Sequence, residues 1–399
     1  MPYAKHLPFH AIDAYPLVWM FGTNAGMKLA SLLGGFWVLV GTYLIIKDRF
    51  SLNIALATVL ALTFHHGFVW MTVVGSADLL FAALFLFGLW AYNKSEKDSS
   101  MYLLAGVFWG FACLTRYNGV PLLGLYLLYG LFARSFHRKL STFWIGFIVA
   151  CGLFGLWLVR NILVFGNPLH TEYSGELSSK SPDLLAQFIS NIFYYVNPLQ
   201  NILPILFIFS LYGIWKFGKK QILIICSIIT ILLVTSIWWV QAMRFAFPAY
   251  PLILAFAIAG LFDVFKKYKF IIPPLFILIV ISHAGALCMY NFGSCNAFVD
   301  KTTNLVPKNL GLTSEGFYAY KKARDYINAN AEEGAYVLVD EAKLNTWAED
   351  VYRSDLILTL DKSVTPLYFM AELLDFGDEV VFITDVYPKT LVIFRRKVE

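Results

Sequence analysis

Three arginines stand at the ends of apolar segments, where each could bind a phosphate group. Arg116 lies between two short apolar runs, Arg160 closes the run of residues 142–160, and Arg244 follows a tryptophan pair. A guanidinium group can donate two parallel N–H groups to phosphate oxygens. The alternative is that each arginine anchors its helix among aromatic side chains at a membrane surface. Because Arg116 and Arg244 are expected at one face of the membrane, we predict that they share an anionic ligand.

An acidic residue stands in a comparable position. Asp78 begins the apolar run of residues 76–92. An ionisable side chain at membrane depth is costly, which suggests a catalytic or binding role for Asp78. The alternative is an acid in the first turn of a helix, which the helix dipole favours without any catalytic role.

Four further side chains are candidates for contact with a substrate: His65, Tyr117, His170 and Glu172. Packing at the membrane interface would explain His65 equally well. His170 and Glu172 share a polar loop that follows Arg160, but a single histidine with nearby acids is weak evidence for a metal. We therefore assign no cofactor and no metal ligand, and a divalent metal stays open.

The chain is too apolar for an ordinary water-soluble enzyme. Of its 399 residues, 59% are hydrophobic and 14% are charged, against about 25% charged in an average soluble domain. The net charge of +5 has two opposed parts, because residues 1–290 hold 19 Lys and Arg against 9 Asp and Glu, whereas residues 291–399 hold 12 against 17. The basic residues fall in membrane loops, which argues against nucleic acid as a partner.

Apolar runs long enough to cross a bilayer dominate the first 290 residues. A transmembrane helix needs about 20 apolar residues. We predict an α-helical polytopic membrane protein with about ten transmembrane helices, near residues 27–46, 53–71, 76–92, 101–115, 118–133, 142–160, 200–215, 221–239, 246–263 and 270–290. The fourth and fifth runs are short, so a re-entrant pair or one long broken helix is an alternative there.

The basic residues of alternate loops predict the orientation of these helices. Of the 19 Lys and Arg in residues 1–290, 13 fall in one set of loops, which we place in the cytoplasm: Lys47, Arg49, Lys94, Lys97, Arg134, Arg138, Lys139, Lys216, Lys219, Lys220, Lys266, Lys267 and Lys269. Residues 1–26 then form an outer N-terminal segment, residues 27–290 the transmembrane domain, and residues 291–399 an extracytoplasmic domain. Such an N-terminal segment either crosses the membrane unaided, as short tails can, or is carried across by a preceding helix. We favour a further helix upstream of this sequence.

The C-terminal domain is predicted to be a small α/β unit. Helical patterns at residues 315–330 and 365–374 alternate with apolar runs of strand length at residues 335–340, 379–384 and 390–394. The unit has no glycine-rich phosphate loop, so we expect a cover or docking surface over the membrane domain.

Three motifs together resemble one family of membrane enzymes. Residues 114–119 (LTRYNG), residues 157–161 (WLVRN) with 165–168 (FGNP), and residues 244–251 (RFAFPAYP) are similar to segments of the GT-C glycosyltransferases. Within that group they are most similar to dolichyl-phosphate-mannose-protein mannosyltransferase-like and aminoarabinose-transferase-like enzymes. The resemblance covers nearly the whole chain and depends on the order of the motifs.

This resemblance implies a plasma-membrane transferase with its active site on the outer face. Its donor would be a sugar linked to polyprenyl or dolichyl phosphate, and its acceptor a protein, lipid or glycan. In the family, an Asp acts as base on the acceptor hydroxyl, which attacks the anomeric carbon with inversion, and basic residues stabilise the departing lipid phosphate. By position, Asp78 matches the acid of the second outer loop, whereas Arg116 and Arg244, with Arg160, would bind the donor phosphate.

The N-terminus departs from the family pattern. The family begins with a helix and an outer loop that bears an acidic pair, whereas this sequence begins downstream of that pair. We therefore expect the polypeptide to be catalytically incomplete.

 Asp13 is the only acidic residue before position 48, and it corresponds to the end of the family's first loop. Asp13 and Asp78 are therefore the two candidate catalytic residues.

Two other functions fit the same sequence. A secondary transporter or flippase would use half-helices and charges at the membrane midplane, but the span pattern has no internal repeat and the charges cluster at the outer ends of helices. An N-terminally truncated, inactive GT-C homologue would keep the fold and bind lipid phosphate without turnover. We favour the active glycosyltransferase.

Overall fold

The computed structural model describes twelve stretches of the chain: residues 7–132, 140–168, 170, 184–196, 204–237, 243–279, 281, 326–338, 356–359, 367–371, 379–383 and 392–396. The contacts divide the chain into two units. The first comprises Met1–Leu287 with Thr302–Gly311, and the second comprises Cys288–Lys301 with Leu312–Glu399.

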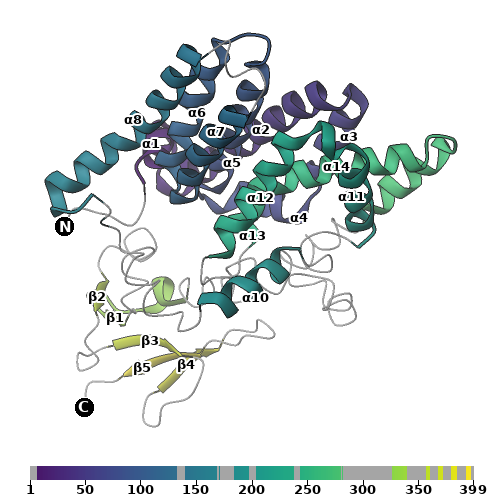
Figure 1. Ribbon diagram of the computed structural model, residues 1–399. Helices are drawn as coiled ribbons and strands as arrows, with labels where there is room; N and C mark the ends of the chain where they lie inside the picture. The colour runs from purple at the N-terminus through teal and green to yellow at the C-terminus, as the bar shows by residue number, and fades with distance from the viewer. Residues whose placement is uncertain are drawn as a thin grey trace. The chain divides into compact units, whose positions relative to one another are not determined.

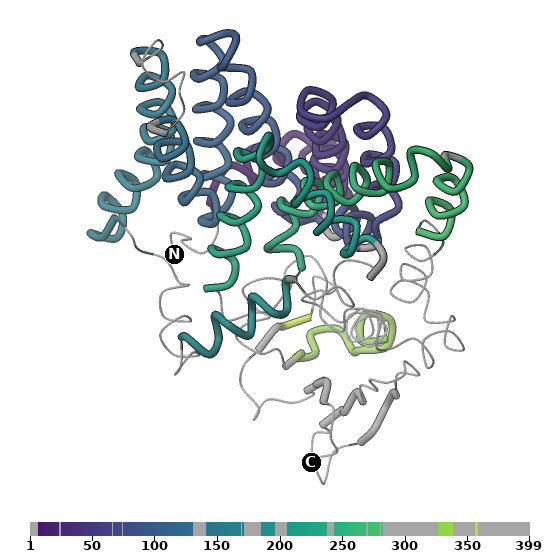
Figure 2. Tube along the Cα trace, turned by 45° about the vertical axis from the view of Figure 1, so that its right-hand side comes forward, coloured from purple at the N-terminus to yellow at the C-terminus, as the bar shows by residue number. Residues whose placement is uncertain are grey.

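The first unit is helical, as the sequence predicts (Figures 1 and 2). A helix satisfies all of its backbone hydrogen bonds internally, which is what an apolar medium requires. Its helices are α1 (Phe9–Phe21), α2 (Thr23–Arg49), α3 (Leu52–Thr63), α4 (His66–Val74), α5 (Asp78–Lys94), α6 (Met101–Thr115), α7 (Val120–Phe132), α8 (Leu140–Phe165), α10 (Leu184–Val196), α11 (Pro204–Phe217), α12 (Ile222–Ser236), α13 (Met243–Ala246) and α14 (Tyr250–Val264). Short 3-10 turns lie at Tyr117–Gly119, Gly218–Lys220, Phe247–Ala249 and Lys269–Ile271.

Three helical segments in the described part of the chain are long and apolar enough to cross a membrane: Ala25–Arg49, Ser141–Phe165 and Met243–Val264. The predicted span at residues 53–71 is wrong as a single helix, because α3 and α4 form a pair bent by 61°. The break falls at His65, whose extended backbone (ψ 121°) interrupts the helical path. Most of the predicted span at residues 270–290 lies outside the described residues, and the total of ten spans stays a prediction.

Glycines allow α6 and α8 to pack closely (Figure 1). Gly106 and Gly110 are four residues apart on α6, and Gly106 faces Gly146 of α8. A Cβ atom at Gly106 would collide with the backbone carbonyl of Gly146. Small residues at this spacing let helix backbones approach one another in a membrane, where apolar burial alone gives little driving force.

We expect Gly106→Ala to destabilise the first unit by about 1–3 kcal/mol, the usual cost of overpacking. The added methyl group has to push α6 and α8 apart. Gly152→Ala on α8 is the matched control, because nothing lies within 4 Å of a Cβ atom there. Thermal unfolding in detergent measures both variants, and equal melting temperatures would contradict the close crossing.

Buried tyrosines join four helices in the same region. The Tyr92 hydroxyl of α5 donates to the carbonyl of Tyr126 on α7 (3.0 Å), and the Tyr126 hydroxyl donates to the carbonyls of Tyr102 (3.1 Å) and Phe143 (3.2 Å). The indole N–H of Trp109 on α6 donates to the carbonyl of Phe85 on α5 (3.1 Å). Each buried polar group named here therefore has a partner, which fixes the relative positions of α5, α6, α7 and α8.

Two ion pairs join α2 and α5 at their C-terminal ends, far from Asp78. At the C-terminal ends of α2 and α5, Lys94 pairs with Asp48 (2.9 Å) and Arg49 pairs with Glu96 (3.3 Å). The Gln221 amide, just before α12, donates to the carbonyl of Arg49 (2.7 Å). Asp78 lies at the other end of α5, about 24 Å away at 1.5 Å per residue.

The second unit contains a five-stranded sheet with the order β2-β1-β3-β5-β4. Its strands are β1 (Tyr336–Leu338), β2 (Ile357–Thr359), β3 (Leu367–Ala371), β4 (Glu379–Ile383) and β5 (Val392–Arg396). Strand β1 is parallel to β2 and β3, whereas β5 is antiparallel to β3 and β4.

The strands β1, β4 and β5 lie where the sequence predicts strands, but the helix predicted at residues 365–374 is wrong. These residues contain β3, which pairs with β1 on one side and β5 on the other. Pairing on both edges outweighs a weak local helical pattern. Of the helix predicted at residues 315–330, residues 326–330 are helical, and the remainder lies outside the described residues.

Candidate functional site

Asp78 and Arg116 form an ion pair between α5 and the turn after α6. Asp78 is the first residue of α5 and is 2% exposed. Arg116 ends α6 in an extended conformation (φ −148°, ψ 143°) and is held by a hydrogen bond from its N–H to the carbonyl of Ala112 (3.0 Å). A buried carboxylate needs such a partner, because an unpaired charge away from water is strongly destabilising.

Arg116 and Arg244 converge on the ring of Phe245. Each guanidinium carbon lies 5.1 Å from the centroid of that ring, within the range of a cation–π contact. The two carbons are therefore at most about 10 Å apart, although the residues are separated by 128 positions in the sequence. Two cations held this close repel each other, and an anion that contacts both would relieve the repulsion.

The segment that carries Arg244 packs against His65. Arg244 and Phe245 belong to α13, and the following turn, Phe247–Ala249, leads into α14. The imidazole of His65 lies 6.4 Å from the ring of Phe247 and 6.1 Å from that of Tyr250. Since His65 is only 5% exposed, its aromatic surroundings favour the packing interpretation over contact with a substrate.

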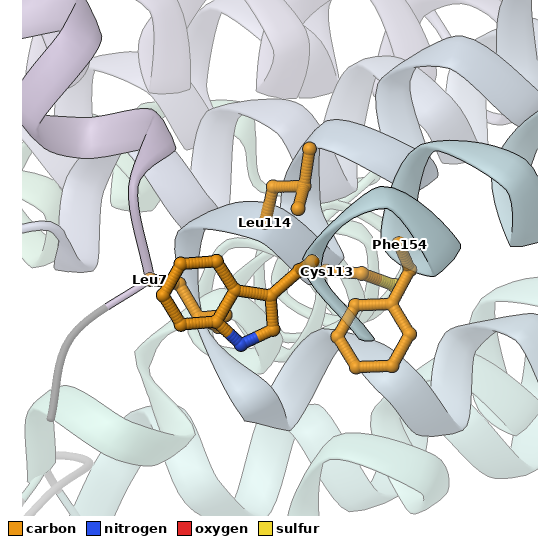
Figure 3. Close-up of a cluster of buried hydrophobic side chains, with 5 residues drawn as sticks. Leu7, Cys113, Leu114 and Phe154 are labelled. Atoms are coloured by element: carbon orange, nitrogen blue, oxygen red, sulfur yellow. The ribbon is translucent and has the colours of Figure 1, made fainter. Parts of the chain in front are cut away.

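Tyr117, the residue after Arg116, packs against a cluster of buried apolar side chains. Figure 3 shows this cluster. The cluster contains Leu7, Cys113, Leu114, Phe154 and Trp157. Its members come from the N-terminal segment, α6 and α8, so the cluster joins all three beside the turn. Tyr117 thereby supports the position of Arg116.

Asp13 lies on α1, and the N-terminal end of α1 packs against α6 close to the Arg116 turn. Phe9 stacks on Phe111 of α6 with 4.4 Å between the ring centroids, and Asp13 follows one helical turn later. The Asp13 side chain is exposed. Neighbouring protein atoms still desolvate its carboxylate enough to raise its pKa, the direction that suits a general base near neutral pH.

Arg160 has different aromatic partners from the other two arginines. Its guanidinium carbon lies 4.6 Å from the centroid of Trp157 and 5.1 Å from that of Phe165, and it donates to the Asn161 side chain (3.0 Å). The Asn161 amide donates to the carbonyls of Pro168 and His170, both at 3.2 Å. These contacts give Arg160 a role in holding the loop after α8.

His170 belongs to the loop after α8 and not to the group formed by Arg116, Arg244 and Phe245. Its ring stacks on Phe165 with 4.2 Å between centroids. Glu172, predicted to lie beside it, is outside the described residues. Among the residues that are described, no three His, Cys, Asp or Glu side chains gather in a way that could hold a metal ion.

Two features of the site were not predicted from the sequence. Phe245 adjoins Arg244 in the chain, but no spacing shows that its ring also contacts Arg116. Helix α10 falls in a region predicted as an outer loop, and it buries Tyr194 and Tyr195. Its apolar residues recur every four positions, which is the signal that could have identified it.

Residues 14–160 match the sequence model of the family described as dolichyl-phosphate-mannose-protein mannosyltransferase. No curated protein matches the whole sequence or part of it significantly.

The solved structures of ArnT share the fold at low sequence identity. ArnT from Cupriavidus metallidurans bound to undecaprenyl phosphate has a TM-score of 0.58 and 15% identity, over 99% of this chain and 88% of that one. Its apo state gives 0.55 and 14% over the same shares. The oligosaccharyltransferase AglB from Archaeoglobus fulgidus gives 0.49 and 13%, over 89% of this chain and 56% of that one. The family match and the ArnT fold confirm the resemblance to GT-C glycosyltransferases.

Proposed function

We propose that this GT-C membrane glycosyltransferase takes a sugar from a polyprenyl- or dolichyl-phosphate donor and transfers it to a protein, lipid or glycan acceptor on the outer face of the membrane. The observation that carries the proposal is the convergence of Arg116 and Arg244 on the ring of Phe245. ArnT, which has the same fold, has been solved bound to undecaprenyl phosphate, and this supports a lipid phosphate as the anion.

The charge of the lipid phosphate explains why two arginines would accelerate the reaction. A sugar phosphodiester carries one negative charge, whereas the phosphate monoester that departs carries about 1.5 to 2. Groups that bind the developing charge more strongly than the starting charge lower the barrier. Arg116 and Arg244 would bind the phosphate, and buried Asp78 would hold Arg116 in position rather than take a proton itself.

The transfer step needs a base for the acceptor. The acceptor hydroxyl oxygen forms a bond to the anomeric carbon, the bond from that carbon to the phosphate oxygen breaks, and the phosphate keeps the electron pair. We assign the hydroxyl proton to the Asp13 carboxylate, because α1 is attached beside the Arg116 turn and Asp78 is engaged by Arg116. Arg160 and His170 would shape the entrance to the site through the loop after α8.

We propose the predicted membrane arrangement with this function: about ten spans in residues 27–290, with residues 1–26 and the domain of residues 291–399 outside the cytoplasm. The ion pairs of Lys94 and Arg49 support the orientation, because they lie at the opposite end of α5 from Asp78. Basic residues of short loops favour the cytoplasm, which leaves the Asp78 end outside.

The test uses the purified chain in lipid nanodiscs with radiolabelled polyprenyl-phosphate sugars. We expect release of polyprenyl phosphate together with labelled product when membrane lipids, glycans or peptides are supplied as acceptors. Absence of both donor binding and transfer across the donors tested would overturn the proposal. Movement of the intact donor across proteoliposomes without transfer would instead identify a flippase.

We expect Asp13→Asn to lower kcat about a hundredfold, because a missing general base typically costs at least that much. Binding of the donor lipid should stay unchanged, since Asp13 is not placed at the phosphate. Asp13→Glu should recover part of the rate. A full rate in Asp13→Asn would exclude this residue as the base while leaving the phosphate site untested by that variant.

A further inference from the structure

Helix α10 exposes a continuous apolar stripe. Leu185, Ile189 and Phe193 follow one another at intervals of four residues and are 69%, 46% and 69% exposed. At this spacing they lie along one face of the helix. The helix has 13 residues and is therefore about 20 Å long, too short to cross a hydrocarbon core of about 30 Å.

The opposite face of α10 carries the amides of Gln187 and Asn191 together with the buried ring of Tyr194. Asn191 is 0% exposed, and its amide donates to the carbonyl of Ser236 at the end of α12 (2.9 Å). The Gln187 amide donates to the Asn191 side chain (2.8 Å). A surface helix in water places its apolar residues inward, whereas α10 exposes Leu185, Ile189 and Phe193.

Helix α10 also lies beside the segment that carries Arg244. The Tyr194 hydroxyl contacts the backbone of Met243, the residue before Arg244. Tyr194 and Tyr195 both lie close to the buried Tyr250. In both Figure 1 and Figure 2, α10 lies beyond the ends of α12 and α13.

We propose that α10 is an interfacial helix that inserts Leu185, Ile189 and Phe193 into the outer leaflet of the membrane. A short helix with one apolar face lies in the plane of the interface and buries that face at the boundary between headgroups and acyl chains. Contact with lipid removes the cost of exposing the stripe to water. Membrane insertion thereby holds Tyr194 against the backbone of Met243 and supports the position of Arg244.

The small area of the apolar stripe favours lipid over a second copy of the chain as the occupant. A stripe of three side chains on one short helix offers far less area than the roughly 800 Å² per partner of a stable protein interface. Lipid, in contrast, surrounds any chain whose helices span a membrane.

The test places a diazirine amino acid at Leu185, Ile189 or Phe193 of the full chain in nanodiscs and identifies photoproducts by mass spectrometry. The matched controls are Gln187, on the inward face, and Ser190, at the edge of the exposed face. We expect about fivefold more lipid adducts at the three stripe positions than at Gln187, because the apolar stripe faces the acyl boundary. These adducts do not depend on glycosyl transfer, so they report on α10 even if the proposed function fails.

Adducts to protein in place of lipid at the stripe positions would overturn the proposal, and so would equal lipid labelling at all five positions. If one variant fails to give a monodisperse protein, the other two stripe positions decide. A separate measurement tests the effect on the site. Phe193→Ser is expected to weaken binding of polyprenyl phosphate severalfold without loss of folded protein, whereas Ser190→Ala leaves it unchanged.

Discussion

Arg244→Ala is expected to lower kcat/KM for the lipid-linked donor about 10²- to 10³-fold, or about 2.7–4 kcal/mol, the usual effect of removing one preorganised group that stabilises developing charge. The Arg244 guanidinium shares the ring of Phe245 with Arg116. Its loss leaves the departing phosphate with one of its two cationic contacts. The measurement is the rate of donor consumption in nanodiscs, together with binding of polyprenyl phosphate.

Two variants make this prediction specific. Arg244→Lys keeps the charge but not the paired N–H groups of the guanidinium fork, so it should recover only part of the rate. Lys219→Ala removes an exposed cation from the turn that leads into α12, whose start contacts the Arg49 end of α2. It should leave the rate unchanged. If Arg244→Ala and Lys219→Ala behave alike, Arg244 does not bind the phosphate.

Removal of either member of the Asp78–Arg116 pair is expected to destabilise the protein by about 3–5 kcal/mol, because the remaining partner becomes an uncompensated buried charge. Asp78 is nearly inaccessible, with a side-chain exposure of 2% against 22% for Arg116. Arg116→Ala should therefore cost more than Asp78→Ala, because it leaves the more deeply buried Asp78 carboxylate without its partner. Thermal or denaturant unfolding of the purified protein in detergent measures both losses.

A double-mutant cycle tests whether these losses come from the pair itself. Asp78→Asn combined with Arg116→Gln removes both charges, so the double variant should be more stable than the sum of the single losses predicts. The pair of Arg49 and Glu96 is the control, because Glu96 is 52% exposed and such surface pairs contribute about 0–1 kcal/mol. Additive losses at Asp78 and Arg116 would contradict a buried pair.

The sequence by itself determines that the first unit is helical and apolar, and it locates most of its helices. Runs of apolar residues identify α2, α5, α6 and α8 because helix formation in an apolar medium depends on residues close together in the chain. The same local reasoning places Arg116 at the end of a helix, since the run of residues 101–115 stops there. The resemblance to GT-C enzymes follows from three motifs and their order.

Tertiary structure decides which of those residues meet. Asp78 and Arg116 are 38 positions apart, and their contact requires α5 and α6 to pack side by side. The Phe245 ring joins two arginines from distant segments, whereas Arg160 lies between Trp157 and Phe165. The local sequence does not distinguish the three arginines, because each of them follows an apolar run.

The errors made from the sequence have the same physical origin. The helical pattern at residues 365–374 yields to strand pairing on both edges of β3, and the run at residues 53–71 breaks at His65. Helix α10 buries Asn191 and exposes Leu185, Ile189 and Phe193, which composition cannot reveal, since composition does not show what each face contacts. Local periodicity therefore predicts where helices form, and only packing between distant segments decides which faces are buried and which side chains form the site.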